Sequence, residues 1–127
     1  MERASKIIEI EALAENLIKK NKGLSLLKLK ILFFASIYEN LSVSMIIEKL
    51  GIKKSNFTLM CGELVQEGLV EIAPAEIDRR CRVLHVTESG REKLNIYKKD
   101  IENMLGASNP ELDRALDVLL EFLNKKI

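Results

Sequence analysis

The sequence has 127 residues, of which 47% are hydrophobic and 31% are charged, and its formal net charge is +1. This length suits one domain, and this composition excludes an intrinsically disordered chain. No apolar run reaches the roughly 20 residues of a membrane helix, and no signal-peptide block is present, so we expect a cytoplasmic protein without a membrane anchor. Two cysteines and a single histidine form neither a disulfide framework nor a zinc-site spacing, so no metal and no cofactor are expected.

The N-terminal part of the chain predicts two amphipathic helices. The first covers about residues 5–20, where apolar residues recur at the three-and-four spacing of one helical face, and residues 21–23 are expected to end it. Ser25 is a good N-cap residue and predicts a second helix that continues to about Tyr38. Residues 39–40 form the break before the central part of the chain.

Residues 41–90 predict a winged helix-turn-helix unit. Its elements are a helix over 43–50, a helix over 54–67, a strand over 69–72, a loop over 73–81, a return strand over 82–86 and a helix start at 87–90. Gly51 and Gly68 follow the two helices, and glycine is the residue that most readily ends a helix. In this unit the second helix most often lies in the major groove of DNA, which makes it the predicted recognition helix.

The C-terminal part of the chain predicts two further helices. A long helix follows Thr87, and the stretch 106–110 is the one break rich in Gly, Ser, Asn and Pro. Pro110 suits the first position of the final helix, with Asn109 or Ser108 as its cap.

The terminal helices are more apolar than the central unit requires. A winged unit of about fifty residues needs one covering helix, whereas three helices here carry wide apolar faces. We therefore predict a single domain, 1–127, that is mostly α-helical with a small β-hairpin wing. Residues 24–90 form its core, and residues 1–22 and 91–127 form a helical dimerisation region. The alternative is a monomer that folds these helices over its own core.

The start of the recognition helix carries residue types that bind DNA. Lysine reaches phosphates or guanine acceptors, asparagine pairs with adenine, and serine or threonine bonds to either. The predicted DNA contacts here are Lys53, Lys54, Ser55, Asn56 and Thr58. The alternative is that the two lysines only solvate a turn that Asn56 caps.

The middle of the recognition helix is less typical of a DNA-binding surface. Helical spacing turns Phe57, Met60, Cys61 and Leu64 inward. Leu59 then faces outward, where it can touch thymine methyl groups, and Gly62 beside it permits close approach of another backbone. Glu63, on the flank, is expected to repel phosphates. An ordinary tolerated surface explains these residues equally well.

The loop 73–81 is too long for a tight hairpin and is predicted to project as a wing. At its tip, Asp78 can hold the guanidinium of Arg80 in position for the DNA minor groove. Arg79 and Arg82 are the further predicted contacts of the wing. The alternative is a solvent-exposed ion pair worth under about 1 kcal/mol.

The net charge of the winged unit does not favour DNA binding. Residues 42–90 carry six basic and seven acidic residues. A phosphate-binding surface must therefore come from where the charges are placed.

Four short motifs resemble the MarR-type winged-helix regulators. They are Leu50-Gly51, the stretch 64–70 that ends in Gly-Leu-Val, Asp78-Arg79-Arg80, and Val86-Thr87-Glu88-Ser89-Gly90. The resemblance covers roughly residues 24–105, and the spacing from the wing to the last glycine is its most specific part.

This resemblance implies a homodimer joined by the N- and C-terminal helices. It also implies that Asp78 and Arg80 match the acid and the minor-groove arginine of the family, and that a small, often aromatic or phenolic, effector binds. The chain departs from the family where Leu59 and Glu63 replace basic or polar residues, and where Ile72 replaces an arginine.

The remaining reactive side chains do not indicate an enzyme. No nucleophile with a base, glycine-rich phosphate loop or paired carboxylate set stands out. The peroxide-sensing branch of the family has its thiol in the first helix, where this chain has none, so we interpret Cys61 and Cys81 as packing residues. His85 is expected to face solvent or phosphate.

The sequence thus predicts a dimeric DNA-binding repressor that reads an inverted repeat in double-stranded DNA. The alternative is a winged-helix module for protein–protein interaction, with Leu59 and Gly62 as its contact and weak or no DNA binding.

Overall fold

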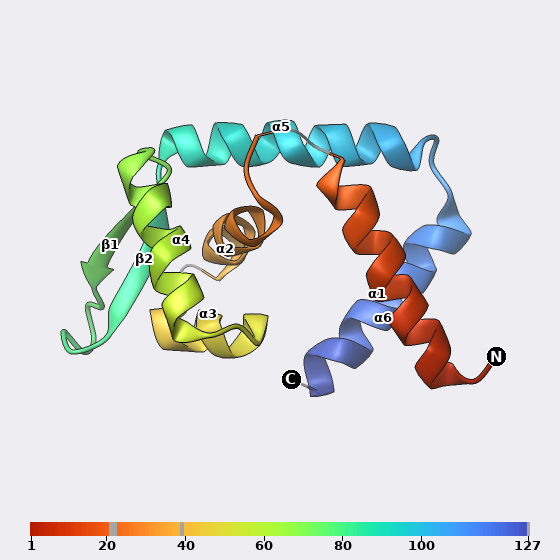
Figure 1. Cartoon of the computed structure of the whole chain (residues 1–127), viewed down its shortest axis with the longest axis horizontal. Coiled ribbons are helices and arrows are strands. Elements are labelled where there is room, and N and C mark those ends of the chain that lie inside the picture. The colour runs from red at the N-terminus through yellow and green to blue at the C-terminus, as the bar shows by residue number, and fades with distance from the viewer. Residues whose placement is uncertain (21–22, 39, 127) are drawn as a thin grey trace.

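A computed structural model describes residues 1–20, 23–38 and 40–126. The elements in chain order are α1 (Arg3–Lys19), α2 (Leu26–Ile37), α3 (Val43–Leu50), α4 (Lys54–Gln66), β1 (Val70–Pro74), β2 (Arg82–Val86), α5 (Glu88–Leu105) and α6 (Pro110–Lys126). In Figure 1, α5 runs along one side, with the winged unit at one end and α1 and α6 at the other. The predicted fold class is confirmed. None of the described helices combines the length and apolarity needed to cross a membrane.

The helix ends follow the predicted caps. Ser25 and Thr87 each accept a hydrogen bond at their side chains from the backbone N–H three residues later, and Asn109 does the same for α6. Gly51 and Gly68 adopt the left-handed backbone, with φ of 63° and 75°, that ends α3 and follows α4. The predicted end of the first helix at residues 21–22 and the break at Glu39 lie outside the described residues.

The two strands form an antiparallel hairpin whose first strand is longer than predicted. Val70 pairs with Val86, and the ladder continues to Pro74 opposite Arg82. The wing loop therefore begins at residue 75 and not at 73. Proline is tolerated there because it stands at the last position of an edge strand, where it donates no ladder hydrogen bond. Ser42, just before α3, bridges to Val83 on the other side of β2.

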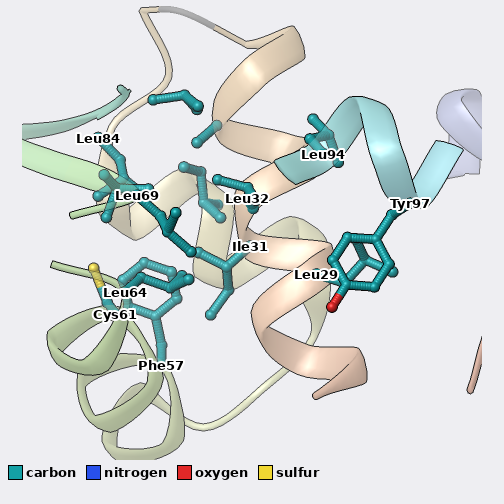
Figure 2. Close-up of a cluster of buried hydrophobic side chains, with 14 residues drawn as sticks. Leu29, Ile31, Leu32, Phe57, Cys61, Leu64, Leu69, Leu84, Leu94 and Tyr97 are labelled. Carbon is teal, nitrogen blue, oxygen red and sulfur yellow. The ribbon is translucent and has the colours of Figure 1, made fainter. Parts of the chain in front are cut away.

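The core of the winged unit is built around α2. Ile31 and Leu32 have no exposed surface. Helix α2 contacts α3, α4, α5 and β2. Figure 2 shows Ile31 between the side chains of α4 and those of α5, where Leu94 and Tyr97 lie. The recognition helix therefore takes its position from α2.

Two hydrogen bonds from Thr87 join the start of α5 to the turn after α4. The hydroxyl of Thr87 donates to the carbonyl of Gly68 at 2.6 Å, and the Thr87 N–H donates to the carbonyl of Leu69 at 3.0 Å. Gly90 is buried against this turn, and a side chain on it would overlap the Leu69 carbonyl oxygen and the Val86 side chain. The Thr-Glu-Ser-Gly motif thus fixes α5 against the end of the recognition helix.

The terminal helices leave large apolar side chains uncovered in the single chain. No described residue of α1 or α6 is buried. The exposed side chains of α1, α5 and α6 include Ile7, Ile10, Leu13, Met104, Leu105, Leu112, Leu116, Leu120, Phe122 and Leu123. These side chains lie outside the core of their own chain. They are therefore available to another molecule.

Two glycine-to-alanine substitutions test the packing at opposite extremes. We expect Gly90→Ala to lower the free energy of unfolding by about 1–3 kcal/mol, because the new methyl group overpacks a closed site. The methyl group of Gly62→Ala would meet only open space. This change should raise the free energy of unfolding by roughly 1 kcal/mol, because alanine has a higher helix propensity than glycine. Urea unfolding measures both, and equal effects of the two changes would contradict this packing.

Candidate nucleic-acid interface

The recognition helix α4 has an apolar inner side and a free outer side. Phe57, Cys61 and Leu64 are at most 2% exposed, whereas Leu59 is 61% exposed. Met60, also predicted inward, is half-buried and packs against the core. The outward face, by which we mean Ser55, Leu59, Gly62 and Gln66, is exposed throughout, as predicted.

The first turn of α4 is open to a ligand. Lys53 is the N-cap residue, and its side chain makes no capping hydrogen bond within the described chain. Lys54, Ser55 and Asn56 are exposed, and the capping role considered for Asn56 is not seen. The hydroxyl of Thr58 donates to the Lys54 carbonyl at 2.9 Å, so its oxygen retains lone pairs that can accept a further hydrogen bond.

The wing contains the predicted ion pair between Asp78 and Arg80. Oδ1 of Asp78 accepts from the Arg80 backbone N–H at 3.0 Å and from Nε at 3.1 Å, and Oδ2 accepts from Nη2 at 3.2 Å. The hydrogen bonds from the guanidinium and then from the backbone N–H lower the pKa of the Asp78 carboxyl. The Arg80 side chain is nevertheless 91% exposed. The carboxylate therefore orients an arginine that stands free in solvent.

A cleft of about 700 Å³ lies between the recognition helix and the wing. It brings together four predicted residues: Lys54, Thr58, Arg80 and Arg82. Its lining includes no acidic residue, and its walls include Gly62 and Ile72. A polyanion that follows this cleft would meet three cations. The cations are thus gathered in one place although the winged unit has no excess of positive charge.

The other predicted site residues lie outside this cleft. Lys53, Ser55 and Asn56 are exposed at the start of α4, and Arg79 lies beside a smaller hollow of about 190 Å³ together with Arg82. The structure also adds Ser42 and Ser44, at the start of α3, to the cleft lining. Ser42 is the N-cap residue of α3, and its hydroxyl accepts from the Met45 N–H at 3.3 Å.

The acidic flank of the recognition helix is paired with a lysine of α2. The carboxylate of Glu63 lies 3.3 Å from Nζ of Lys28 in α2, and that of Glu67 lies 2.8 Å from the same ammonium. Glu63 and Glu67 therefore share one cation from outside the 42–90 segment, which offsets one of their two negative charges. Lys49, in turn, lies over the Tyr38 ring at 5.0 Å.

The two cysteines differ, and the interpretation of Cys81 as a packing residue is wrong. Cys61 is buried, and burial raises the pKa of its thiol. Cys81 is exposed because its backbone is held in the wing turn by hydrogen bonds with Asp78 and Ala75, which leaves the side chain outside the core. His85 is exposed opposite Glu71 in the hairpin, as expected. The described residues contain no group of His, Cys, Asp and Glu that could hold a metal ion.

Comparison with known proteins finds likeness in structure and not in sequence. No protein-family model matches the sequence, and no curated protein matches it significantly. The transcriptional regulator BldR from Sulfolobus solfataricus is 22% identical with a TM-score of 0.69, and the match covers 98% of this chain and 99% of that one. Wild-type MarR of E. coli in its apo form is 17% identical with a TM-score of 0.76, and 97% of each chain is covered.

A third similar structure is BpsR from Bordetella bronchiseptica, whose DNA binding is regulated by 6-hydroxynicotinic acid. It is 15% identical with a TM-score of 0.69, and the match covers 97% of this chain and 93% of that one. All three matches span both terminal helices as well as the winged unit. The chain therefore has the winged helix-turn-helix fold of the MarR-type transcriptional regulators.

Proposed function

We propose that the protein is a DNA-binding transcriptional regulator that places α4 in the major groove and the wing against the minor groove. The observation that carries this proposal is the cleft between them, which gathers Lys54, Arg80 and Arg82 and has no acid in its lining. Contacts of these cations to phosphates would fix the register of the protein on DNA. The exposed first turn of α4, with Ser55 and Asn56, would then read base edges.

We further propose that the protein acts as a homodimer. A second copy would cover the apolar side chains that α1, α5 and α6 leave exposed. Two winged units related by a two-fold axis would read an inverted repeat with half-sites roughly 10 base pairs apart. Bound over a promoter, such a dimer would act as a repressor, and by analogy with BpsR a small molecule would regulate its DNA binding.

A protein-interaction module is the second candidate. Leu59 is 61% exposed in the middle of the outward face, and Gly62 beside it has open space in front of it. The two functions differ in their response to salt, because DNA binding through several phosphates weakens by orders of magnitude as salt rises, whereas an apolar protein contact changes little.

Substitutions at Arg80 and Asn56 distinguish contacts that position the protein on DNA from contacts that recognise bases. We expect Arg80→Ala to weaken binding to specific and nonspecific duplexes alike and to flatten the salt dependence, because its contact is to phosphate or to the minor groove. Asn56→Ala should cost about 1–3 kcal/mol on the preferred duplex and leave nonspecific binding nearly intact. Fluorescence anisotropy with a duplex recovered from a random pool, and with a scrambled duplex, measures both.

Asp78→Ala is the matched control for this pair. If the carboxylate only orients the guanidinium, its loss should weaken binding less than the loss of Arg80 does. Parent-like binding by all three variants would contradict the proposed face and favour the protein-interaction module.

Leu59 provides a test at the level of a single methyl group. We expect replacement of thymine by deoxyuridine at one position of the recovered duplex to weaken binding by about three- to tenfold, because the C5 methyl group that Leu59 touches is lost. The Leu59→Ala variant should bind both duplexes equally. If no thymine position distinguishes the parent from this variant, the outward face does not read methyl groups.

The dimer is tested at its last helix. Sedimentation at micromolar concentration should give the mass of two chains, and Leu116→Glu with Leu119→Glu should dissociate or unfold the dimer, because two charges would enter its apolar contact. Lys125→Glu, at an exposed position with only an i,i+4 ion pair, is the surface control. A parent that sediments only as a single chain would overturn the proposal.

A further inference from the structure

Lys28 makes an ionic contact between α2 and the recognition helix. Its side chain is only 12% exposed, although lysine usually projects into solvent. Nζ lies 2.8 Å from Oε1 of Glu67 and 3.3 Å from Oε1 of Glu63. The hydrogen bond to Glu67 and the one to Glu63 raise the pKa of Lys28 against the opposing effect of burial. The ammonium is thus a fixed cation between two carboxylates.

Glu63 and Glu67 need this cation because of where they stand on α4. They are one helical turn apart, so their like charges repel each other along the helix. Glu63 also follows Leu59 by one turn and therefore borders the outward face. A free carboxylate at that edge would oppose the approach of DNA phosphates.

Lys28 draws both carboxylates toward the start of α2. Lys28 lies in the first turn of this helix, where Ser25 is the N-cap residue, and the Ser25 hydroxyl lies 3.9 Å from the Met60 sulfur on the same flank of α4. The positive end of the α2 dipole favours negative charge at this place. Three successive turns of the recognition helix, at Met60, Glu63 and Glu67, therefore contact the first turn of α2.

We propose that Lys28 is a positioning residue for DNA recognition. It holds the flank of α4 against α2 through Glu63 and Glu67, and it offsets one of their two charges in the field that DNA meets at the outward face. The inference rests on the proposed DNA-binding function and assigns part of it to a residue outside the helix-turn-helix and the wing. Lys28 itself touches no DNA.

The experiment measures DNA binding of the full chain over a range of salt concentrations. The probe is a duplex recovered from a random pool with the parent protein, and circular dichroism shows which variants are folded. Lys28→Met should weaken binding by about three- to tenfold at low salt, and this deficit should shrink as salt rises, because repulsion between exposed charges is screened. Lys28→Arg, which keeps the charge, should bind like the parent.

The combined variant Lys28→Met/Glu63→Gln/Glu67→Gln distinguishes charge from general damage. With the carboxylates gone, binding should return to within about threefold of the parent, since no repulsive charge remains at the edge of the face. A merely structural role for Lys28 would not produce this rescue or the dependence of the deficit on salt. If Lys28→Met does not fold, Lys28→Gln takes its place, because the amide can still donate to Glu67, and the same salt-dependent loss is expected.

The outcomes separate this inference from the proposed function. Parent-like binding by the Lys28 variant overturns the inference alone, as does a deficit that is independent of salt and persists in the combined variant. If the parent binds no duplex even at low salt, the proposed function fails and the inference fails with it.

Discussion

The burial of α2 decides where every other part of the winged unit lies. Ile31 and Leu32 are completely enclosed, and enclosing each such side chain contributes about 1.5–3 kcal/mol of hydrophobic stabilisation. The enclosing elements are α3, α4, α5 and the second strand, so the recognition helix and the long helix α5 are packed on one common element. A displacement of α2 would therefore disturb the positions of both α4 and α5, because a close-packed core transmits strain.

Most of the fold could be predicted from the sequence because local signals agree with one another. Ser25 and Thr87 cap the helices that follow them, and Gly51 and Gly68 take the left-handed conformation that their positions predict. The strand boundary was less certain, because Ala73 and Pro74 are unusual in a strand and only the pairing with β2 keeps them there.

The candidate site was predicted only where its contacts are local. Asp78 and Arg80 are two residues apart, so an ion pair between them follows from their spacing and is present. Lys28 and Glu67 are far apart in sequence, and their contact depends on how α2 crosses α4, which no local pattern encodes. Cys81 was misjudged because a residue at the start of a strand follows the turn geometry of the wing and not the alternation of the strand.

The proposed function requires that a nearly neutral chain present a surface that attracts DNA. Ion pairs on two sides of the outward face would meet this requirement, one set beside the recognition helix and one in the wing. On one edge, Lys28 forms ion pairs with the carboxylates of Glu63 and Glu67 and holds them beside α2. On the other edge Asp78 uses only Nε and Nη2 of Arg80, so the remaining N–H groups of that guanidinium stay free to donate. The carboxylate lowers the net charge of the wing but fixes the arginine, which reduces the entropy lost when it enters a groove. Under the proposed function, attraction to DNA would depend on a few oriented cations around one cleft, and the formal charge of the chain would then be a poor guide to what it binds.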